Sequence, residues 1–374
     1  MDRGSSKARL WAASAWQREQ GNNLREWRSS PQSLTFPFLT TLCEAVGPAT
    51  LGRASSPQAL CATFPKFQTQ CNDVGFENGD EVAAYTILYL VERYRRMTHV
   101  LERLFTAGHL PIRRHKLAAL EVGAGPAPGL SAVRDFYDDL SVWAQRTSQP
   151  VDFTPLTHAF AMDKGPAWEA LLHDLWERIN GLRLQSLGYM GSGLYQIQYS
   201  DFTDFSAIQE HIRALESSVR VIEDDFDRAS EHISRASARQ WAQEEGIHVP
   251  SAYDLIIMSN FLTDPQATKR FGKEIRHLAS SLTPGGLIVV LGGQAGFYEG
   301  LWVDLGRLLR GAGLTSLKAF NDAIPPGRDS RWAEQIQAQR HRDLGAIRRG
   351  GGTLPQSLEK LDEPYRLREF SALV

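Results

Sequence analysis

From residue 113 onward, continuous apolar stretches of strand length alternate with amphipathic stretches of helix length, and this alternation is the strongest constraint on the fold. The strand candidates are residues 116–122, 156–163, 194–202, 218–226, 252–262, 285–293 and 368–374. Strands that are apolar throughout are typical of a sheet buried on both faces, and helices are the usual connections between parallel strands. The sequence therefore predicts an α/β fold with a doubly wound, mostly parallel, seven-stranded sheet.

Glycines crowd the end of the first predicted strand, in the segment LEVGAGPAPGLSAV at residues 120–133. Glu121 ends the strand, and Gly123 and Gly125 form a turn before an amphipathic helix. Ligands of such sheets bind outside the carboxyl ends of the strands, where glycine lets the backbone approach them and a helix N-terminus presents N–H groups. The turn predicts a nucleotide-like ligand, which on the glycines alone is NAD, FAD or S-adenosylmethionine. A tight turn without any ligand is the alternative.

Two further segments decide among these ligands. They are YDLIIMSNFL at residues 253–262 and LTPGGLIVVLGG at residues 282–293. Together with LEVGAGPAPG, and in this order, they resemble the motifs of the class I S-adenosylmethionine-dependent methyltransferases over roughly residues 115–320 and the last strand. The resemblance implies a Rossmann-like sheet, S-adenosyl-L-methionine as cofactor and methyl transfer as the reaction. One departure is Ala127, which stands where the third glycine of the usual loop is expected.

The resemblance also implies roles for individual residues. Gly123 and Gly125 would line the cofactor, and Glu121 would lie near its ammonium group, with a helix-cap role as the alternative. Asp163, at the end of the second predicted strand, would accept both ribose hydroxyls. A neutral side chain reproduces such a pair of accepted hydrogen bonds poorly.

An acid after the third family strand would meet the adenine amino group. Asp225 with Phe226 is preferred, because that predicted strand directly precedes the helix leading into the fourth family strand. Asp201 with Phe202 is the alternative, and a helix cap without a ligand is as good an explanation of either acid.

Ser259, followed by Asn260 and Asp264, would lie under the methyl group. Methyl transfer from a sulfonium depends mainly on positioning the acceptor in line, so no acid or base is required. SNFL is not the Asn-Pro-Pro-aromatic motif of amine methyltransferases, which argues against DNA as acceptor, and no cysteine lies near these strands. No catalytic residue is assigned.

Outside this region the sequence predicts three further parts. Residues 1–35 read as a polar tail with a short helix around Trp11 and Trp16, and residues 36–112 as a helical cap domain. Residues 113–374 form the methyltransferase-like domain, with a basic insertion at 328–352 before the last strand. The insertion is predicted to be flexible, with RNA contact as the alternative. The arginines at 93, 95 and 96 are interpreted as a solvated helix face rather than a substrate-facing patch.

Composition limits the partners. The net charge of −2 gives no general attraction to phosphate or anionic lipid, and no run of about 18 apolar residues predicts a membrane span. Cys43, Cys61 and Cys71 are scattered and odd in number, which indicates free thiols, no metal site and a cytoplasmic location.

A small-molecule acceptor is therefore favoured, without DNA or membrane partners and with the oligomeric state open. An RNA methyltransferase and a non-catalytic methyltransferase-like assembly or binding factor are the alternatives. GGQAGFYEGLWVDLGRLL at residues 292–309 is similar to a segment of the methyltransferase-like proteins that assist mitochondrial small ribosomal subunit assembly. Those proteins carry a cysteine cluster in the methyltransferase part, whereas this chain has no cysteine beyond Cys71.

Overall fold

The computed structural model describes residues 3–69, 75–113, 117–150, 158–189, 194–199, 253–259, 261, 266–293, 299–317, 324, 330–359, 365–367 and 369–374. The α/β class predicted from the sequence is confirmed. Among the described residues no helix is long and apolar enough to cross a membrane.

Six strands form one mixed sheet in the order β3-β2-β1-β4-β5-β6. The parallel strands are β1 (Ala118–Val122), β2 (His158–Asp163), β3 (Leu194–Tyr199), β4 (Tyr253–Ser259) and β5 (Leu282–Gly292), and β6 (Ser371–Leu373) runs antiparallel to β5. Each of the six lies at a predicted strand. The predicted strand at 218–226 lies outside the described residues.

Backbone groups also meet the outer side of the last strand. Leu317 N–H donates to the Val374 carbonyl at 2.8 Å, and Ile324 and Phe370 exchange N–H···O bonds of 2.8 and 3.2 Å. These contacts place Leu317 and Ile324 beside the C-terminal segment.

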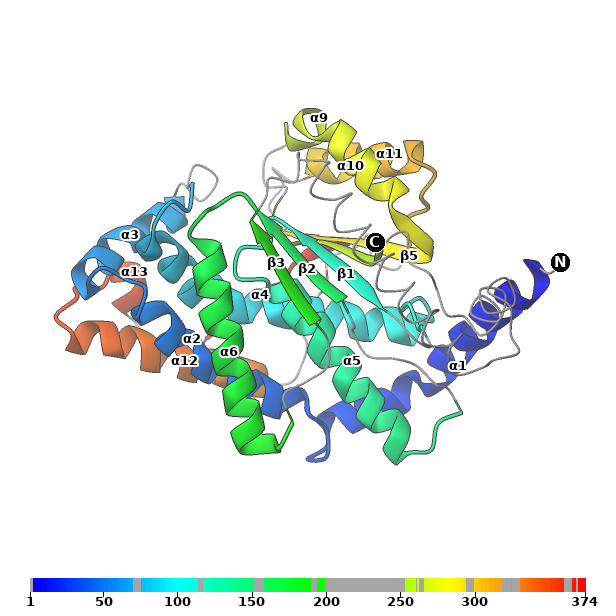
Figure 1. Cartoon of the computed structure of the whole chain (residues 1–374), viewed down its shortest axis with the longest axis horizontal. Helices are drawn as coiled ribbons and strands as arrows, with labels where there is room; N and C mark the ends of the chain where they lie inside the picture. The colour runs from blue at the N-terminus through cyan, green and yellow to red at the C-terminus, as the bar shows by residue number, and fades with distance from the viewer. Residues whose placement is uncertain are drawn as a thin grey trace, which may run out of the picture.

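Alternate side chains of the central strands enter two separate hydrophobic clusters. Ala119, Leu255 and Val289 face the helices α4 (Gly79–Ala107), α5 (Pro128–Arg146) and α6 (Trp168–Leu187). Leu120 and Ile256 face the other side, where α10 (Gly272–Ser280) and α11 (Glu299–Gly311) pack, with α9 (Ala267–Arg270) beside them. Figure 1 shows the sheet between these two helical layers. This period of two is what a strand buried on both faces produces.

The layer over the first face is built around α4. It contacts α1 (Arg3–Ser29), α2 (Thr35–Leu51), α3 (Pro57–Thr69) and α5. Asn78 caps α4 by accepting from Glu81 N–H, and Gly108 ends it in the left-handed conformation at φ 78°. These helices share one hydrophobic cluster with the sheet face, so the described residues 36–69 and 75–112 are continuous with its core.

Residues 1–35 were predicted to form a polar tail. This prediction is wrong for the residues of the segment whose side chains the structure describes. Trp16, Leu24 and Trp27 of α1 are buried in the same cluster as the sheet. The overall polarity of the segment hid this, because only one stripe of a helix has to be apolar for the helix to pack. The helix predicted around Trp11 and Trp16 is present but much longer.

The prediction of a flexible insertion at 328–352 is likewise wrong for most of this segment. Residues 330–349 form α12 (Ser330–Arg349), which packs against α2, α3 and α4, and α13 (Gln356–Glu359) follows. Ile336, Leu344 and Ile347 are buried against the helical layer. Gln339 Nε2 donates to Asp343 Oδ2 at 2.7 Å, which fixes a buried carboxylate on the same face. The basic residues of this segment therefore belong to an amphipathic helix.

Asp139 of α5 joins the N-terminal helices to the sheet layer. It is fully buried, and its two carboxylate oxygens accept five hydrogen bonds from residues 27–35. Oδ1 accepts from Trp27 Nε1 at 3.1 Å and Leu34 N–H at 2.7 Å. Oδ2 accepts from Arg28 at 3.3 Å and from the hydroxyls of Ser33 and Thr35, both at 2.9 Å. One side chain thus fixes the junction between α1 and α2 on α5.

Candidate functional site

The strand order reverses between β1 and β4. The chain passes from β1 outward to β2 and β3, then returns to place β4 on the other side of β1. The helices α5 and α6 lie on one face, and α10 lies on the other. Loops therefore diverge at the carboxyl ends of β1 and β4, which is where ligands of open α/β sheets bind. The predicted residues Gly123 and Ser259 both lie at this point.

The glycine turn after β1 is tightly packed. Gly123 has φ +60°, and a Cβ added there would overlap the ring of Phe261, just beyond β4. Gly125 faces aromatic carbons of Trp168 and Tyr85, which would lie 3.5 and 3.6 Å from an added Cβ. Three aromatic side chains of the chain itself, those of Phe261, Trp168 and Tyr85, therefore lie against these glycines.

Ala127 completes the turn in an unfavourable backbone conformation. It is buried and precedes α5 with φ 49° and ψ 51°, the left-handed region in which a Cβ is disfavoured. A glycine, which the methyltransferase motif would place at this position, adopts this conformation without strain. The replacement of the expected glycine by Ala127 therefore leaves a strained residue in the turn.

Glu121 caps the helix that follows the turn. It is fully buried, and its carboxylate accepts from Gly129 N–H at 3.1 Å and Leu130 N–H at 2.9 Å, in the first turn of α5. A Cβ at Gly129 would lie 2.9 Å from Glu121 Oε1, so this close approach requires glycine. Burial raises the pKa of Glu121 to about 8, against the lowering effects of the two N–H donors and of Arg93. The geometry is that of the helix-cap alternative, and a ligand contact of Glu121 stays a prediction.

Asp163 ends β2 and reaches the same turn. Its Oδ2 accepts from Gly125 N–H at 2.8 Å, and its Oδ1 accepts from Gly165 N–H at 2.9 Å. Burial raises the pKa of this carboxyl, while the N–H donors of Gly165 and Gly125 oppose the rise. Asp163 thus lies beside the glycine turn at the end of its predicted strand, and its contact with a ribose stays a prediction. Each oxygen keeps a lone pair for a further donor.

Ser259 is the last residue of β4 and is only 4 % exposed. Its Oγ has no hydrogen-bond partner within the part of the chain that the structure describes. Asn260, Asp264 and the candidates Asp201, Phe202, Asp225 and Phe226 lie outside the described residues. The structure thus brings together Glu121, Gly123, Gly125, Asp163 and Ser259 at one end of the sheet.

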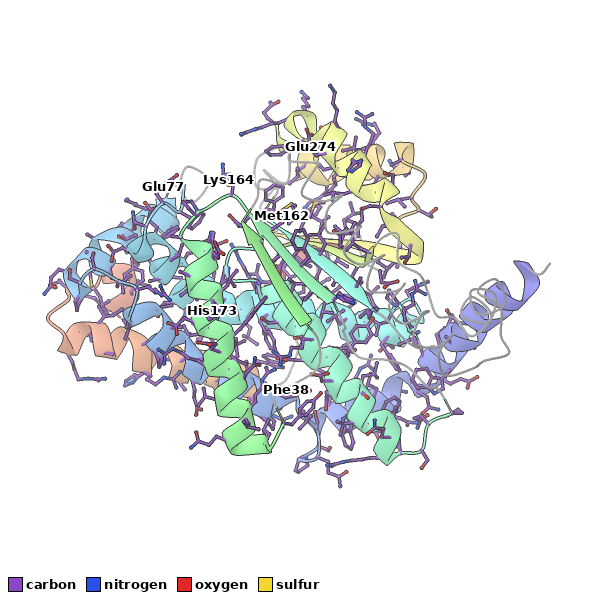
Figure 2. The ribbon with its side chains drawn as sticks, in the orientation of Figure 1. Phe38, Glu77, Met162, Lys164, His173 and Glu274 are labelled. Atoms are coloured by element: carbon purple, nitrogen blue, oxygen red, sulfur yellow. The ribbon has the colours of Figure 1, made fainter. Side chains whose placement is uncertain are left out.

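Aromatic residues near the turn were missed by the sequence analysis. Phe76 lies before α4, Tyr85 on α4 and Trp168 at the start of α6, and their ring centroids are 4.9–5.7 Å apart. Figure 2 labels Glu77 close to Lys164 at the end of β2, in keeping with the hydrogen bond from Ala167 N–H to the Phe76 carbonyl. Helix α4 therefore contributes to the site, a contact that no local sequence signal predicts.

The interpretation of the arginine cluster as a solvated helix face is wrong. Arg95 is 2 % exposed and pairs with Glu92 at 2.8 Å, and Arg96 pairs with the same carboxylate at 3.2 Å. Arg93 lies over the rings of Tyr85 and Tyr89, with its Cζ 4.7 and 5.1 Å from their centroids. It also contacts the Tyr85 hydroxyl. Arg93 therefore places a positive charge near the glycine turn.

The described cysteines agree with the expectation of free thiols. Cys43 and Cys61 are both free and buried, and burial raises the pKa of Cys43 to about 12. Within the described ranges, no group of three or more His, Cys, Asp or Glu residues could hold a metal ion. No protein-family model and no curated protein matches the chain.

Proposed function

We propose that this chain binds S-adenosyl-L-methionine at the glycine turn after β1 and transfers its methyl group to a small molecule. The observation that carries the proposal is the meeting of Gly125 and Asp163 at the point where the strand order reverses. The three ordered motifs and the antiparallel last strand support the same reading. A seventh strand at the predicted segment 218–226, which would complete a doubly wound Rossmann-like sheet, is part of this proposal.

Asp163 is the proposed holder of the ribose. Its two oxygens are already oriented by backbone N–H groups, so a diol would add to an arrangement that needs no rotation. Gly123 and Gly125 would offer the ligand backbone groups only, because Phe261, Trp168 and Tyr85 already lie where added side chains would be. Glu121 would support the site indirectly, because it accepts from the Gly129 and Leu130 N–H groups and so holds the start of α5 beside the glycine turn.

The chain's contribution to the reaction would be positioning. S-adenosylmethionine, when bound, supplies a methyl group on a positively charged sulfur. Ser259 lies at the end of β4 with a buried hydroxyl that can donate or accept, which suits the orientation of an acceptor. Holding two reactants in line can supply a large part of the rate without a general base.

Titration calorimetry with S-adenosylhomocysteine tests the binding. Wild type should bind, and Asp163→Ala should weaken binding by roughly tenfold or more, the value of a charge-assisted hydrogen bond. Gly123→Val should abolish binding. Asp304→Ala on α11, which removes a partly exposed carboxylate paired only with Arg307 among the contacts described, serves as the control. Thermal melts confirm that each variant is folded. No binding by wild type at millimolar ligand would refute the proposal.

The acceptor is tested separately. Methyl transfer to a metabolite extract, without binding to bulk RNA, would support a small-molecule acceptor. RNA binding that weakens steeply with salt would favour an RNA methyltransferase instead, because neutralised phosphates release counterions. Cofactor binding without transfer to either pool would favour the non-catalytic binding or assembly factor. A cytoplasmic location stays a prediction.

A further inference from the structure

Trp168 carries a buried hydrogen-bond donor beside the glycine turn. The side chain is 2 % exposed, and its Nε1–H has no partner within the described residues. A buried indole N–H normally finds an acceptor, because an unpaired donor inside a protein is costly. The position of this N–H therefore points to an acceptor supplied from outside the described chain.

The indole lies between two glycines that the Asp163 carboxylate also joins. A Cβ at Gly165 would lie 3.0 Å from Trp168 Nε1, and a Cβ at Gly125 would lie 3.8 Å from Cε2, the carbon bonded to that nitrogen. Asp163 accepts from the backbone N–H of the same two residues. A donor and an acceptor thus lie side by side at the end of β2.

Phe76 covers this donor–acceptor pair. Its Cβ would lie 2.8 Å from a Cβ at Gly165, and its ring is tilted against Trp168 at a centroid distance of 4.9 Å. Phe76 has φ 56°, a conformation that a bulky residue rarely adopts. Strain of this kind is concentrated at ligand-contacting positions. Displacing the Phe76 ring would remove the aromatic carbons that pack against the Trp168 indole.

We propose that Trp168 Nε1–H donates to a ribose hydroxyl oxygen of a bound nucleoside whose hydroxyls donate to Asp163. A hydroxyl is both donor and acceptor, so a cis-diol can satisfy the carboxylate and the indole together. The inference takes the nucleoside from the proposed function, but the diol is shared by S-adenosylmethionine and NAD. Trp168 would therefore discriminate ribose from deoxyribose ligands.

The test compares two single substitutions on the same helix. Trp168→Phe removes the N–H, and Trp176→Phe is the control, two turns along α6 and also buried. Calorimetry is run with S-adenosylhomocysteine, its 2′,3′-dideoxy analogue and NAD. Trp168→Phe should weaken S-adenosylhomocysteine binding about fivefold, equivalent to about 1 kcal/mol. The dideoxy analogue should bind Trp168→Phe and wild type equally, and Trp176→Phe should bind both ligands as wild type does.

A second variant tests whether the Phe76 ring covers the Trp168 N–H. Phe76→Gly removes the ring, and glycine adopts a positive φ without strain. This variant should therefore bind S-adenosylhomocysteine at least as tightly as wild type. Weaker binding would contradict the role of Phe76 as a displaceable cover.

The outcomes separate the two proposals. Equal binding of S-adenosylhomocysteine by wild type and Trp168→Phe, or the same loss with the dideoxy analogue, overturns the role of Trp168 and leaves the proposed function standing. Wild-type binding of NAD but not S-adenosylhomocysteine, with the loss at Trp168→Phe seen for NAD, supports the role of Trp168 and overturns the methyltransferase proposal. Binding of neither ligand by wild type overturns both.

Discussion

Replacing Asp139 by asparagine should weaken the attachment of α1 to α5. The carboxylate accepts five hydrogen bonds, two on Oδ1 and three on Oδ2. An asparagine oxygen can keep the Trp27 and Leu34 donors. Its amide nitrogen then faces Ser33 and Thr35, whose hydroxyls can turn to accept, and Arg28, which cannot accept at all.

The magnitude follows from the Arg28 contact. Arg28 is 6 % exposed, and its other acidic neighbour, Glu102, is 3.7 Å away. Losing one charge-assisted hydrogen bond to a buried group costs about 1.5–3 kcal/mol, so Asp139→Asn should lower the free energy of unfolding by about that amount. Asp139→Ala leaves up to five donors unpaired. Its expected cost approaches the whole stability of a typical protein, about 5–15 kcal/mol.

Urea unfolding followed by circular dichroism, with hydrogen exchange of α1 amides, measures both the size and the location of the effect. Asp139→Asn should lower the urea midpoint and speed exchange in α1 and at residues 30–35 before it affects α10 or α11. Asp304→Asn on α11 is the matched control and should stay within about 0.5 kcal/mol of wild type. A midpoint for Asp139→Asn equal to that of the control would refute the reasoning.

Two further predictions concern the glycine turn. Because burial raises the pKa of Glu121 to about 8, the folded chain binds a proton there that the unfolded chain releases near its ordinary pKa of about 4.3. The stabilising contribution of this proton is therefore complete below that ordinary value and falls as the pH rises toward 8, by at most about 1.4 kcal/mol per pH unit. Glu121→Gln should remove this slope from a series of urea midpoints, and parallel curves for the two proteins would contradict the assignment. Ala127→Gly should raise stability by up to about 1 kcal/mol, because glycine adopts the left-handed conformation without strain. The control, Ala124→Gly in the same turn, should lower it, so a loss of stability on Ala127→Gly would contradict the strain.

The apolar segments of the sequence predicted the strands. They also predicted the end of the sheet at which the candidate site lies. The apolar segments containing Ala118–Val122 and Tyr253–Ser259 can be placed only as buried strands, and parallel strands align their carboxyl ends. The resemblance assigned Gly125 and Asp163 to one ligand, and in the structure Gly125 N–H donates to the Asp163 carboxylate. The choice between a ligand contact and a helix cap for Glu121 depended on the position of α5, which the strand pattern does not fix.

Long-range contacts account for what the sequence did not predict. Asp139 resembles any acidic residue on a helix until residues 27–35 pack against it, and Trp168 resembles an ordinary first-turn residue until Phe76 and Tyr85 meet it. The burial of α1 depends on a stripe of tryptophan and leucine diluted by polar residues, so its average composition resembles that of a solvated tail. These contacts join segments far apart in sequence and leave no local periodicity.

The packing of α12 on α2, α3 and α4 has a consequence for synthesis on the ribosome. Roughly 240 residues separate the end of α4 from the end of α12, and at about 5–20 residues per second their translation takes roughly 12–48 s. During that interval the apolar surface that Ile336, Leu344 and Ile347 will cover has no native partner, so it is open to chaperones and to neighbouring nascent chains. The N-terminal helices can reach their final packing only after almost the entire chain has emerged.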